Sequence, residues 1–333
     1  MTTRLEVWVN LLLFGTHFTE KEFCRILDGV KGAGGSGVEV PVLDDPPGCY
    51  RGLGVFAGYQ NAAKARGLGV SAVGMVDRLH DPSSLDRDIS QEGLLLLTRQ
   101  IHRASALGST VICGPLVLPW KDFPVDAAGN RLTGNALVDH IGDRLQRAVL
   151  LLQDVADYAA RRSIVLYLEY LKGWELPGLN LLEQVIDFVL AVNRQNFGIL
   201  FDSCHETSDG RGPRVFIDQM RRVLAKKIPV WDHASAPGQR GDITETWINW
   251  DGIFDTRKGM GWRGPLVLEI FNATEPFASG VCINRAEFAN PFAILKKGIE
   301  FLQTRCGTFK VPAGEPSSAS ESPLPGVEAH TLA

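Results

Sequence analysis

Eight short apolar runs, rich in β-branched residues, alternate along the chain with longer segments of helical periodicity. This alternation is typical of strand–helix units that build a parallel sheet buried on both faces. The predicted strands are Leu5–Phe14, Val38–Val42, Gly69–Val76, Thr110–Cys113, Ile164–Glu169, Gly198–Asp202, Ile228–His233 and Leu266–Ile270. Eight such units favour an α/β fold of the closed (β/α)8 TIM-barrel type over a doubly wound sheet, and no G-x-G-x-x-G motif follows the first run.

The segments between these runs are predicted to be helices. The clearest is Ala136–Arg162, in which apolar residues recur at three- and four-residue steps and two arginines complement the dipole in the last turn. The others are Thr19–Val30, Gln91–Ala106, Leu181–Asn193, Pro213–Ala225, Trp250–Met260 and Ala286–Thr304. Residues 1–308 are expected to form one catalytic barrel domain. Residues 309–333, which are rich in Pro and Ser, are expected to form a disordered tail.

The charge of the chain argues against two classes of partner. The 34 basic and 38 acidic residues give a formal charge of −4, so no basic surface for nucleic acid or an anionic membrane is expected.

The sequence also bears on where the protein is found. The longest apolar run is too short to span a bilayer, and no secretory signal precedes it. The six cysteines lie far apart, which indicates free thiols. We therefore expect a cytoplasmic protein.

Polar residues stand at or near the ends of the four last predicted strands. They are Glu169, Asp202, His233 and Glu269. In this fold the carboxyl ends of the strands meet at one mouth, where active sites are built. A single carboxylate at a strand end is more often a helix cap, and a single histidine is more often a buried core residue. Four consecutive strands that all end in such residues favour a shared metal site instead. Three carboxylates and one imidazole suit a divalent cation such as Mn²⁺, Co²⁺ or Mg²⁺.

Three further candidates follow these residues closely in sequence. Glu175 lies six residues after Glu169, His205 three after Asp202, and Arg240 seven after His233. They can hold substrate hydroxyls through charge-assisted hydrogen bonds, or they can be solvated loop charges. Trp120 and Trp174 are candidates for an apolar wall on which a sugar stacks, whereas core packing is the expected role of Trp8 and Phe14.

Several motifs resemble those of a known family. They are ICGPL at 112–116, LEYLKGWE at 168–175, FDSCHE at 201–206, WDHASAPGQRGDI at 231–243 and WDGIFDTRKGMGWRGPLVLEIF at 250–271. The chain resembles the xylose-isomerase-like superfamily of sugar isomerases and epimerases, and within it the ketose 3-epimerase group, which includes D-tagatose and D-allulose 3-epimerases. The resemblance extends to about residue 305.

The resemblance implies roles for these residues. Glu169, Asp202, His233 and Glu269 match the four metal ligands of the family, and Glu169 and Glu269 also match the two glutamates that act as acid and base on opposite faces of the sugar. Glu175, His205 and Arg240 match the residues that hold the O1–O2 end of a ketose, although Arg240 lies one residue later than the usual spacing. The implied reaction removes the C3 proton, passes through a cis-enediolate, and returns a proton to the opposite face.

The resemblance also implies the partners of the protein. They are Mn²⁺, with Co²⁺ or Mg²⁺ as alternatives, a free sugar as substrate, and a second copy of the chain in a dimer or tetramer. Because the PGQRG loop carries a single cation, we expect a non-phosphorylated sugar.

Other functions on the same scaffold stay open at this point. They are an aldose–ketose or keto-inositol type isomerase, a C-glycoside-cleaving lyase with a small second subunit, and an inactive binding barrel. A DNA-repair endonuclease would need more histidine ligands and a basic face, which seven histidines and a charge of −4 disfavour.

Overall fold

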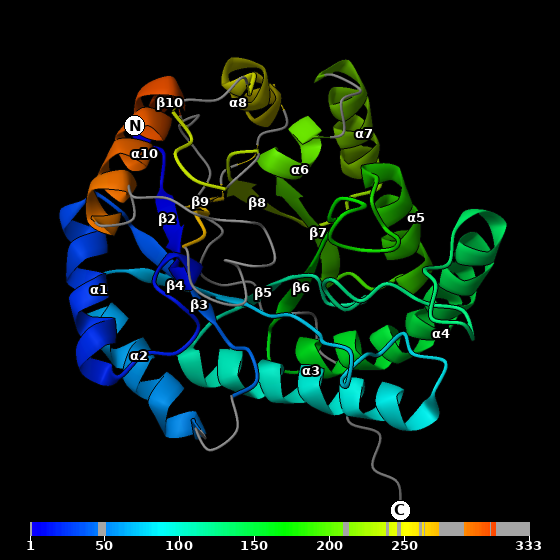
Figure 1. Ribbon diagram of the computed structural model, residues 1–333. Helices are drawn as coiled ribbons and strands as arrows, with labels where there is room; N and C mark the ends of the chain where they lie inside the picture. Colours follow the sequence, from blue (N-terminus) through cyan, green and yellow to red (C-terminus); the bar gives the residue numbers. More distant parts are fainter. Residues whose placement is uncertain are drawn as a thin grey trace, which may run out of the picture.

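Eight parallel strands close into a barrel and follow one another around it in sequence order (Figure 1). The computed structural model describes residues 2–45, 51–208, 213–237, 240–244, 248–259, 262, 264–272, 290–306 and 308–310, without the side chains of 2–4, 213, 214, 216, 217, 306 and 308–310. The barrel strands are β2 (Val7–Asn10), β3 (Gly37–Pro41), β4 (Gly69–Val73), β5 (Val111–Gly114), β6 (Val165–Glu169), β7 (Phe197–Asp202), β8 (Val230–Ala234) and β9 (Leu266–Leu268). The predicted (β/α)8 barrel is therefore confirmed.

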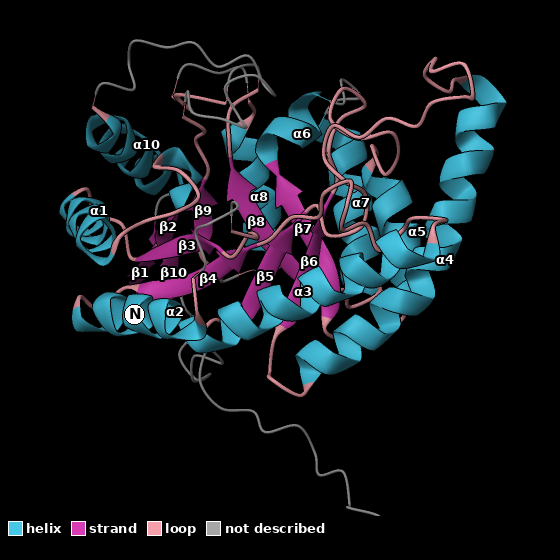
Figure 2. Cartoon of the chain, turned by 60° about the horizontal axis from the view of Figure 1, so that its bottom comes forward, coloured by secondary structure: helices cyan, strands magenta, loops and turns pink. Residues whose placement is uncertain are grey.

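Helices surround the barrel in both views (Figures 1 and 2). They are α1 (Glu20–Gly32), α2 (Leu53–Ala65), α3 (Arg87–Leu107), α4 (Gly134–Ala160), α5 (Leu182–Val192), α6 (Ser203–Ser208), α7 (Pro213–Ala225), α8 (Trp250–Gly259) and α10 (Pro291–Cys306). Local chemistry sets several of their ends. Thr19 and Glu22 form a capping box at the start of α1, and Gly108 ends α3 with a φ of 74° that glycine adopts without strain.

Several local predictions differ from the structure, and two of them have a clear physical reason. The first apolar run was predicted as one strand, but β2 ends at Asn10 and a 3-10 helix (Leu11–Leu13) follows, because the Asn10 side chain accepts a hydrogen bond from the backbone N–H of Leu12. Helix α2 was not predicted. Its sequence contains Gly54 and Gly58, both poor helix formers.

The two ends of the described chain pair with each other. Strand β1 (Thr2–Arg4) runs antiparallel to β10 (Thr308–Lys310), so the folded chain extends to Lys310. The rest of the predicted tail, 311–333, lies outside the described residues. Cys24, Cys113 and Cys204 are free thiols, as expected, and Cys49, Cys282 and the side chain of Cys306 are not described.

The lower part of the barrel interior is filled by aromatic side chains. The indole of Trp8 packs over two glycines, and a Cβ atom added at Gly37 or Gly69 would lie 2.5 or 2.4 Å from it. Trp8 also meets Trp231 edge-on at a ring distance of 5.7 Å, and Tyr167 lies 5.9 Å from Trp231. Core packing of Trp8 is therefore confirmed, and small residues on β3 and β4 make room for it.

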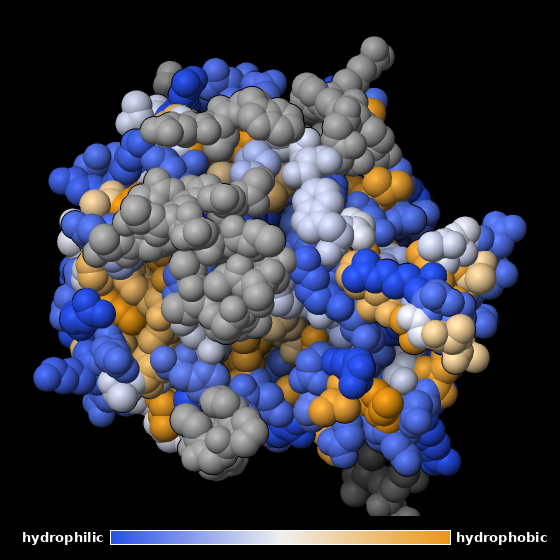
Figure 3. Space-filling view, viewed as in Figure 1, coloured by the Kyte–Doolittle hydropathy of each residue, from blue (hydrophilic) through white to orange (hydrophobic). Residues whose placement is uncertain are grey.

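The described surface is of mixed polarity (Figure 3). Large exposed apolar side chains lie on different helices, such as Leu53 on α2, Leu95 on α3 and Leu150 on α4. Scattered exposed apolar residues of this kind are ordinary on folded proteins. Among the described helices, none has the length and apolar character needed to cross a membrane.

A buried ion cluster ties the segment after β3 to helix α3. The two carboxylate oxygens of Asp45 lie 2.6 Å from Nε of Arg51 and 2.7 Å from Nη2 of Arg103. Burial opposes the charge on Asp45, but hydrogen bonds from Arg51 and the charges of both arginines lower its pKa below the ordinary value. The contribution of this cluster to stability is therefore present at neutral pH and is lost as the pH falls through that lowered pKa.

We expect Asp45→Asn to lower the free energy of unfolding by about 3–5 kcal/mol, because the change leaves Arg51 and Arg103 buried without their main counter-charge. Urea unfolding at pH 7 measures it. The control is Asp28→Asn, which breaks the exposed pair with Arg66 and should change stability by less than about 1 kcal/mol. Equal losses in the two variants would contradict the prediction.

Candidate functional site

The four strand-end residues predicted as ligands meet at the carboxyl end of the barrel. Glu169 ends β6, Asp202 ends β7, and His233 lies on β8 directly opposite Asp202 in the strand register. Glu269 follows β9, where its backbone N–H still donates to the carbonyl of Ala234 on β8. One atom from each of the four side chains lies within 4.8 Å of the others, and all four are buried. The sequence pattern therefore corresponds to one cluster in space.

Asp202 is held by the start of helix α6, which follows β7 directly (Figure 2). Its Oδ1 accepts hydrogen bonds from the backbone N–H groups of Cys204 and His205, and Ser235 donates its hydroxyl to the same carboxylate at 2.7 Å. Burial opposes the charge, but Arg240 and the neighbouring histidines lower the pKa of Asp202 well below its ordinary value. Asp202 is therefore an ionised carboxylate of fixed orientation at neutral pH.

The three residues predicted to hold the substrate lie in the same cluster. His205 places Nε2 3.3 Å from Glu169 and Nδ1 3.7 Å from Glu175. The guanidinium of Arg240 lies 3.4 Å from Asp202, 3.3 Å from His205 and, at Nη2, 2.7 Å from Glu269. All three side chains are buried, which excludes the alternative that they are solvated loop charges.

Arg240 reaches the cluster through an unusual backbone conformation. Its φ is 55°, in the left-handed region that costs a residue with a Cβ atom about 1–2 kcal/mol. Its carbonyl accepts from the backbone N–H of Phe271, whose ring lies 4.9 Å below the guanidinium. Arg240 thus lies in the mouth in this conformation, one residue later than the spacing that the sequence resemblance implies, and Gln239 lies outside the described residues. Backbone strain of this kind is often found at functional sites.

Glu169 combines burial with several charged neighbours. Burial, more than any other cause, raises its pKa to about 7, and the charges of Glu269 and Asp202 act in the same direction, while His205 opposes them. A carboxyl group with a pKa near neutrality can both accept and donate a proton at physiological pH.

The donor set of the cluster fits a divalent cation. Three carboxylates and one imidazole are typical ligands of Mn²⁺, Co²⁺ or Mg²⁺. Two buried atoms of the set, Oε1 of Glu169 and Nδ1 of His233, make no hydrogen bond within the described structure. Their nearest charged neighbours are His205 and Glu269, each at 3.3 Å, and an ion shared by the four residues would satisfy both buried atoms.

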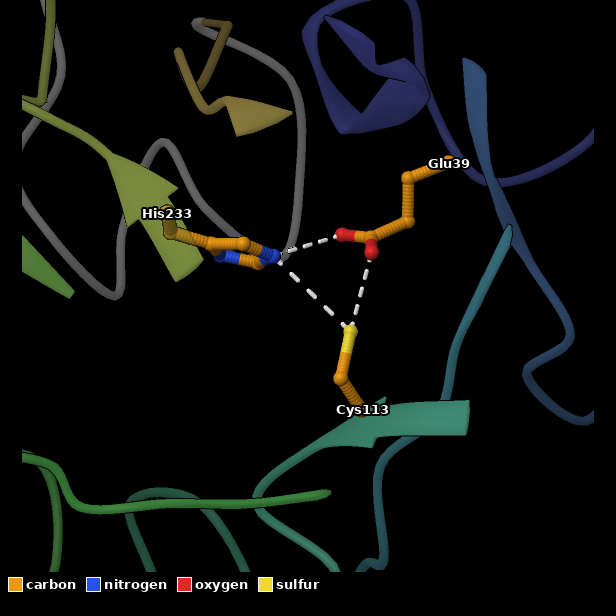
Figure 4. A group of neighbouring side chains, drawn as sticks. All are labelled: Glu39, Cys113 and His233. Atoms are coloured by element: carbon orange, nitrogen blue, oxygen red, sulfur yellow. Dashed lines mark hydrogen bonds and ion pairs between the residues drawn. The ribbon is translucent and has the colours of Figure 1, made fainter. Parts of the chain in front are cut away.

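A carboxylate outside the predicted set stands behind His233. Glu39 lies on β3, fully buried, and its Oε1 is 2.8 Å from Nε2 of His233 (Figure 4). Asn10, on β2, donates its side-chain amide to Glu39 and to Glu269, both at 3.0 Å. The sequence carried a signal for Glu39, because a single charged residue interrupts the apolar run Val38–Val42. Asn10 lies within the first predicted strand, and its position there did not indicate a place in the site.

A cavity opens directly above the cluster. Its volume is about 500 Å³, including the part open to solvent. Polar residues of the site and apolar side chains share its wall. The lining residues are Leu12, Leu43, Val73, Gly74, Met75, Pro115, Trp120, Glu169, Leu171, Glu175, Arg240, Glu269 and Phe271. Trp120 therefore lies where an apolar wall was expected, whereas Trp174 is more than half exposed.

Comparison with known proteins identifies the family. A family model described as xylose isomerase-like TIM barrel matches residues 27–305. A ketose 3-epimerase of Arthrobacter globiformis is 26% identical over 276 residues, which cover 81% of this chain and 85% of that protein. An L-ribulose 3-epimerase of Methylomonas sp. (strain DH-1) is 24% identical over 228 residues, covering 68% and 73%.

A solved structure has the same architecture. It is described as a putative sugar phosphate isomerase/epimerase from Anabaena variabilis ATCC 29413, and it superposes with a TM-score of 0.83 at 24% identity, covering 91% of this chain and 98% of that one. This likeness agrees with the closed barrel described above. The chain belongs to the xylose isomerase-like TIM-barrel family.

Proposed function

We propose that this protein is a divalent-metal-dependent ketose 3-epimerase that acts on a free ketose. The observation that carries the proposal is the pair of buried glutamates, Glu169 and Glu269, which belong to one ligand cluster and line the cavity above it. The relatives that are 3-epimerases support isomerase chemistry on a sugar. Epimerisation at C3 needs two proton-transferring groups on opposite faces of the carbon, and no redox cofactor.

In this proposal a cation is held by four residues. Glu169, Asp202, His233 and Glu269 bind it, and we expect Mn²⁺, with Co²⁺ or Mg²⁺ as alternatives. When bound, the cation supplies positive charge that stabilises the negative charge developing on the sugar oxygens. The orientation of Asp202 by two backbone N–H groups and Ser235 prepares this arrangement before the ion arrives.

The two glutamates move the proton. One removes the C3 proton of the ketose to give a cis-enediolate, and the other returns a proton to the opposite face. Burial raises the pKa of Glu169, whereas a cation bound beside it would act in the opposite direction and favour the carboxylate as the base. Arg240 and Asn10 hold the other carboxylate, Glu269, through hydrogen bonds of 2.7 and 3.0 Å.

Three residues orient the ketose. Glu175, His205 and Arg240 hold the O1–O2 end by charge-assisted hydrogen bonds. Their mutual contacts around Glu169 and Asp202 fix them beside the ligand cluster. The C3 carbon is thereby placed between the two glutamates.

Reaction in D2O tests the position of the chemistry. With Mn²⁺ and a panel of free ketoses, we expect deuterium in both the product and the recovered substrate at C3, because each glutamate exchanges its proton with solvent. NMR spectra of the sugars locate the label. Exchange confined to C1 or C2 would refute the epimerase and indicate an aldose–ketose isomerase instead.

A further inference from the structure

Glu39, Cys113 and His233 lie close enough together to resemble a second metal site (Figure 4). The carboxylate of Glu39, however, already accepts five hydrogen bonds. Its donors are Asn10 Nδ2 at 3.0 Å, Ser71 Oγ at 3.1 Å, Cys113 Sγ at 3.0 Å, Trp231 Nε1 at 3.0 Å and His233 Nε2 at 2.8 Å. An indole N–H and an amide NH2 are donors only. No lone pair of Glu39 is left for a cation, so the group is a hydrogen-bonded network.

The network determines which nitrogen of His233 faces the ligand cluster. Nε2 points to Glu39, so this nitrogen donates its proton, and Nδ1 lies on the other edge of the ring, 3.3 Å from Glu269. A neutral imidazole that carries its proton on Nε2 has its free lone pair on Nδ1. Nδ1 is also the atom of the ring without a hydrogen bond in the described structure.

We propose that Glu39 is a positioning residue that holds the proton of His233 on Nε2 and thereby presents Nδ1 to the metal. This inference rests on the proposed metal site. Asn10 extends the effect, because one amide group binds both Glu39 and Glu269 and so couples the orientations of the two carboxylates. Partners that orient a metal-binding histidine typically change metal affinity about 10–100-fold when they are altered.

A glutamine in place of Glu39 would have nearly the same shape, but one of its two terminal groups would be an NH2 donor. This NH2 group would face side chains that are themselves hydrogen-bond donors. If that NH2 faces Trp231, two donors meet and neither can accept. If it faces His233, the ring must accept at Nε2, which moves its proton to Nδ1, the atom that faces the cluster. The second orientation removes the lone pair on Nδ1 that a cation needs, whereas the first leaves the carbonyl on His233 but sets two donors against each other at Trp231.

We expect Glu39→Gln to weaken Mn²⁺ binding about 10–100-fold, measured by calorimetry on the metal-depleted full chain. The control is Ser71→Ala, which removes a donor from the other oxygen of Glu39, Oε2, and should leave Mn²⁺ affinity unchanged. Thermal unfolding of both variants monitors the fold. Unchanged affinity in Glu39→Gln, or an equal loss in Ser71→Ala, would overturn the proposal.

A second measurement needs no change at Glu39. In wild-type protein labelled with 15N-histidine and saturated with Mg²⁺, we expect the His233 ring proton on Nε2, with the signal assigned by its loss in His233→Ala. A proton on Nδ1 would overturn the proposal even if Glu39→Gln does not fold. A wild type that binds Mn²⁺ and protonates Nε2 but exchanges no C3 proton would refute the epimerase and leave the role of Glu39 intact.

Discussion

Glu269→Gln is expected to lower the rate of C3 epimerisation by roughly 10²–10⁴-fold, the range typical of a lost general acid–base group. The amide keeps the size of the side chain but can neither take nor return a proton at neutral pH. It also loses the charged contact with Arg240, which lies 2.7 Å from the carboxylate. Initial rates in both directions, at Mn²⁺ concentrations that saturate each protein, separate the loss of proton transfer from the loss of metal.

The same variant also tests whether two bases act. If Glu169 serves the opposite face of the sugar, it still removes the C3 proton of one epimer and exchanges it with solvent without inversion. In D2O, Glu269→Gln should therefore label one epimer at C3 and leave the other unlabelled. The matched control is Glu92→Gln on the exposed face of α3, which should keep full activity. Wild-type turnover in Glu269→Gln would remove Glu269 from the mechanism.

Removal of divalent ions with a chelator should abolish turnover, and added Mn²⁺ should restore it. Charge stabilisation by a metal is worth several kcal/mol in a transition state, so we expect a loss of about 10³-fold or more. The mouth of the barrel places three carboxylates near one another, and without a cation Arg240 and the nearby histidines are their counter-charges. Rates and metal content, measured on the same samples, provide the check.

Asp202→Asn tests whether the expected metal dependence arises from this ligand cluster. The amide retains the shape of Asp202 but not its negative charge, so more Mn²⁺ should be needed for half-maximal activity. Asp28→Asn, in an exposed pair on α1, is the control that should leave the Mn²⁺ requirement unchanged. Activity that persists in protein shown by metal analysis to hold no divalent ion would contradict the metal-dependent mechanism.

The strand-end residues could be predicted because backbone geometry alone brings them together. Asp202 and His233 end neighbouring apolar runs, and parallel pairing places the two residues directly opposite each other. Glu269 follows its strand by one residue, and its backbone still bonds to β8. A pattern of apolar runs that end in polar side chains is enough to locate such a site in a barrel.

Other features depend on contacts that sequence periodicity does not encode. The role of Glu39 requires five donors from four other strands of the barrel, which only the closed fold places around one carboxylate. Helix α2 has two glycines and little contrast between its faces, so its packing against α1 and α3 decides its conformation. The position of Arg240 depends on a left-handed backbone that no residue preference predicts for an arginine.

The aromatic packing of Trp8 over Gly37 and Gly69 has a kinetic consequence for the proposed reaction. Trp8 and Trp231 pack together inside the barrel beneath the cluster, so we expect the contents of the pocket to exchange with water through the mouth. A proton taken from the sugar then has two fates, return to carbon or escape past the mouth. The ratio of retained to washed-out label at C3 would therefore compare the rate of return to carbon with the rate of exchange through the mouth.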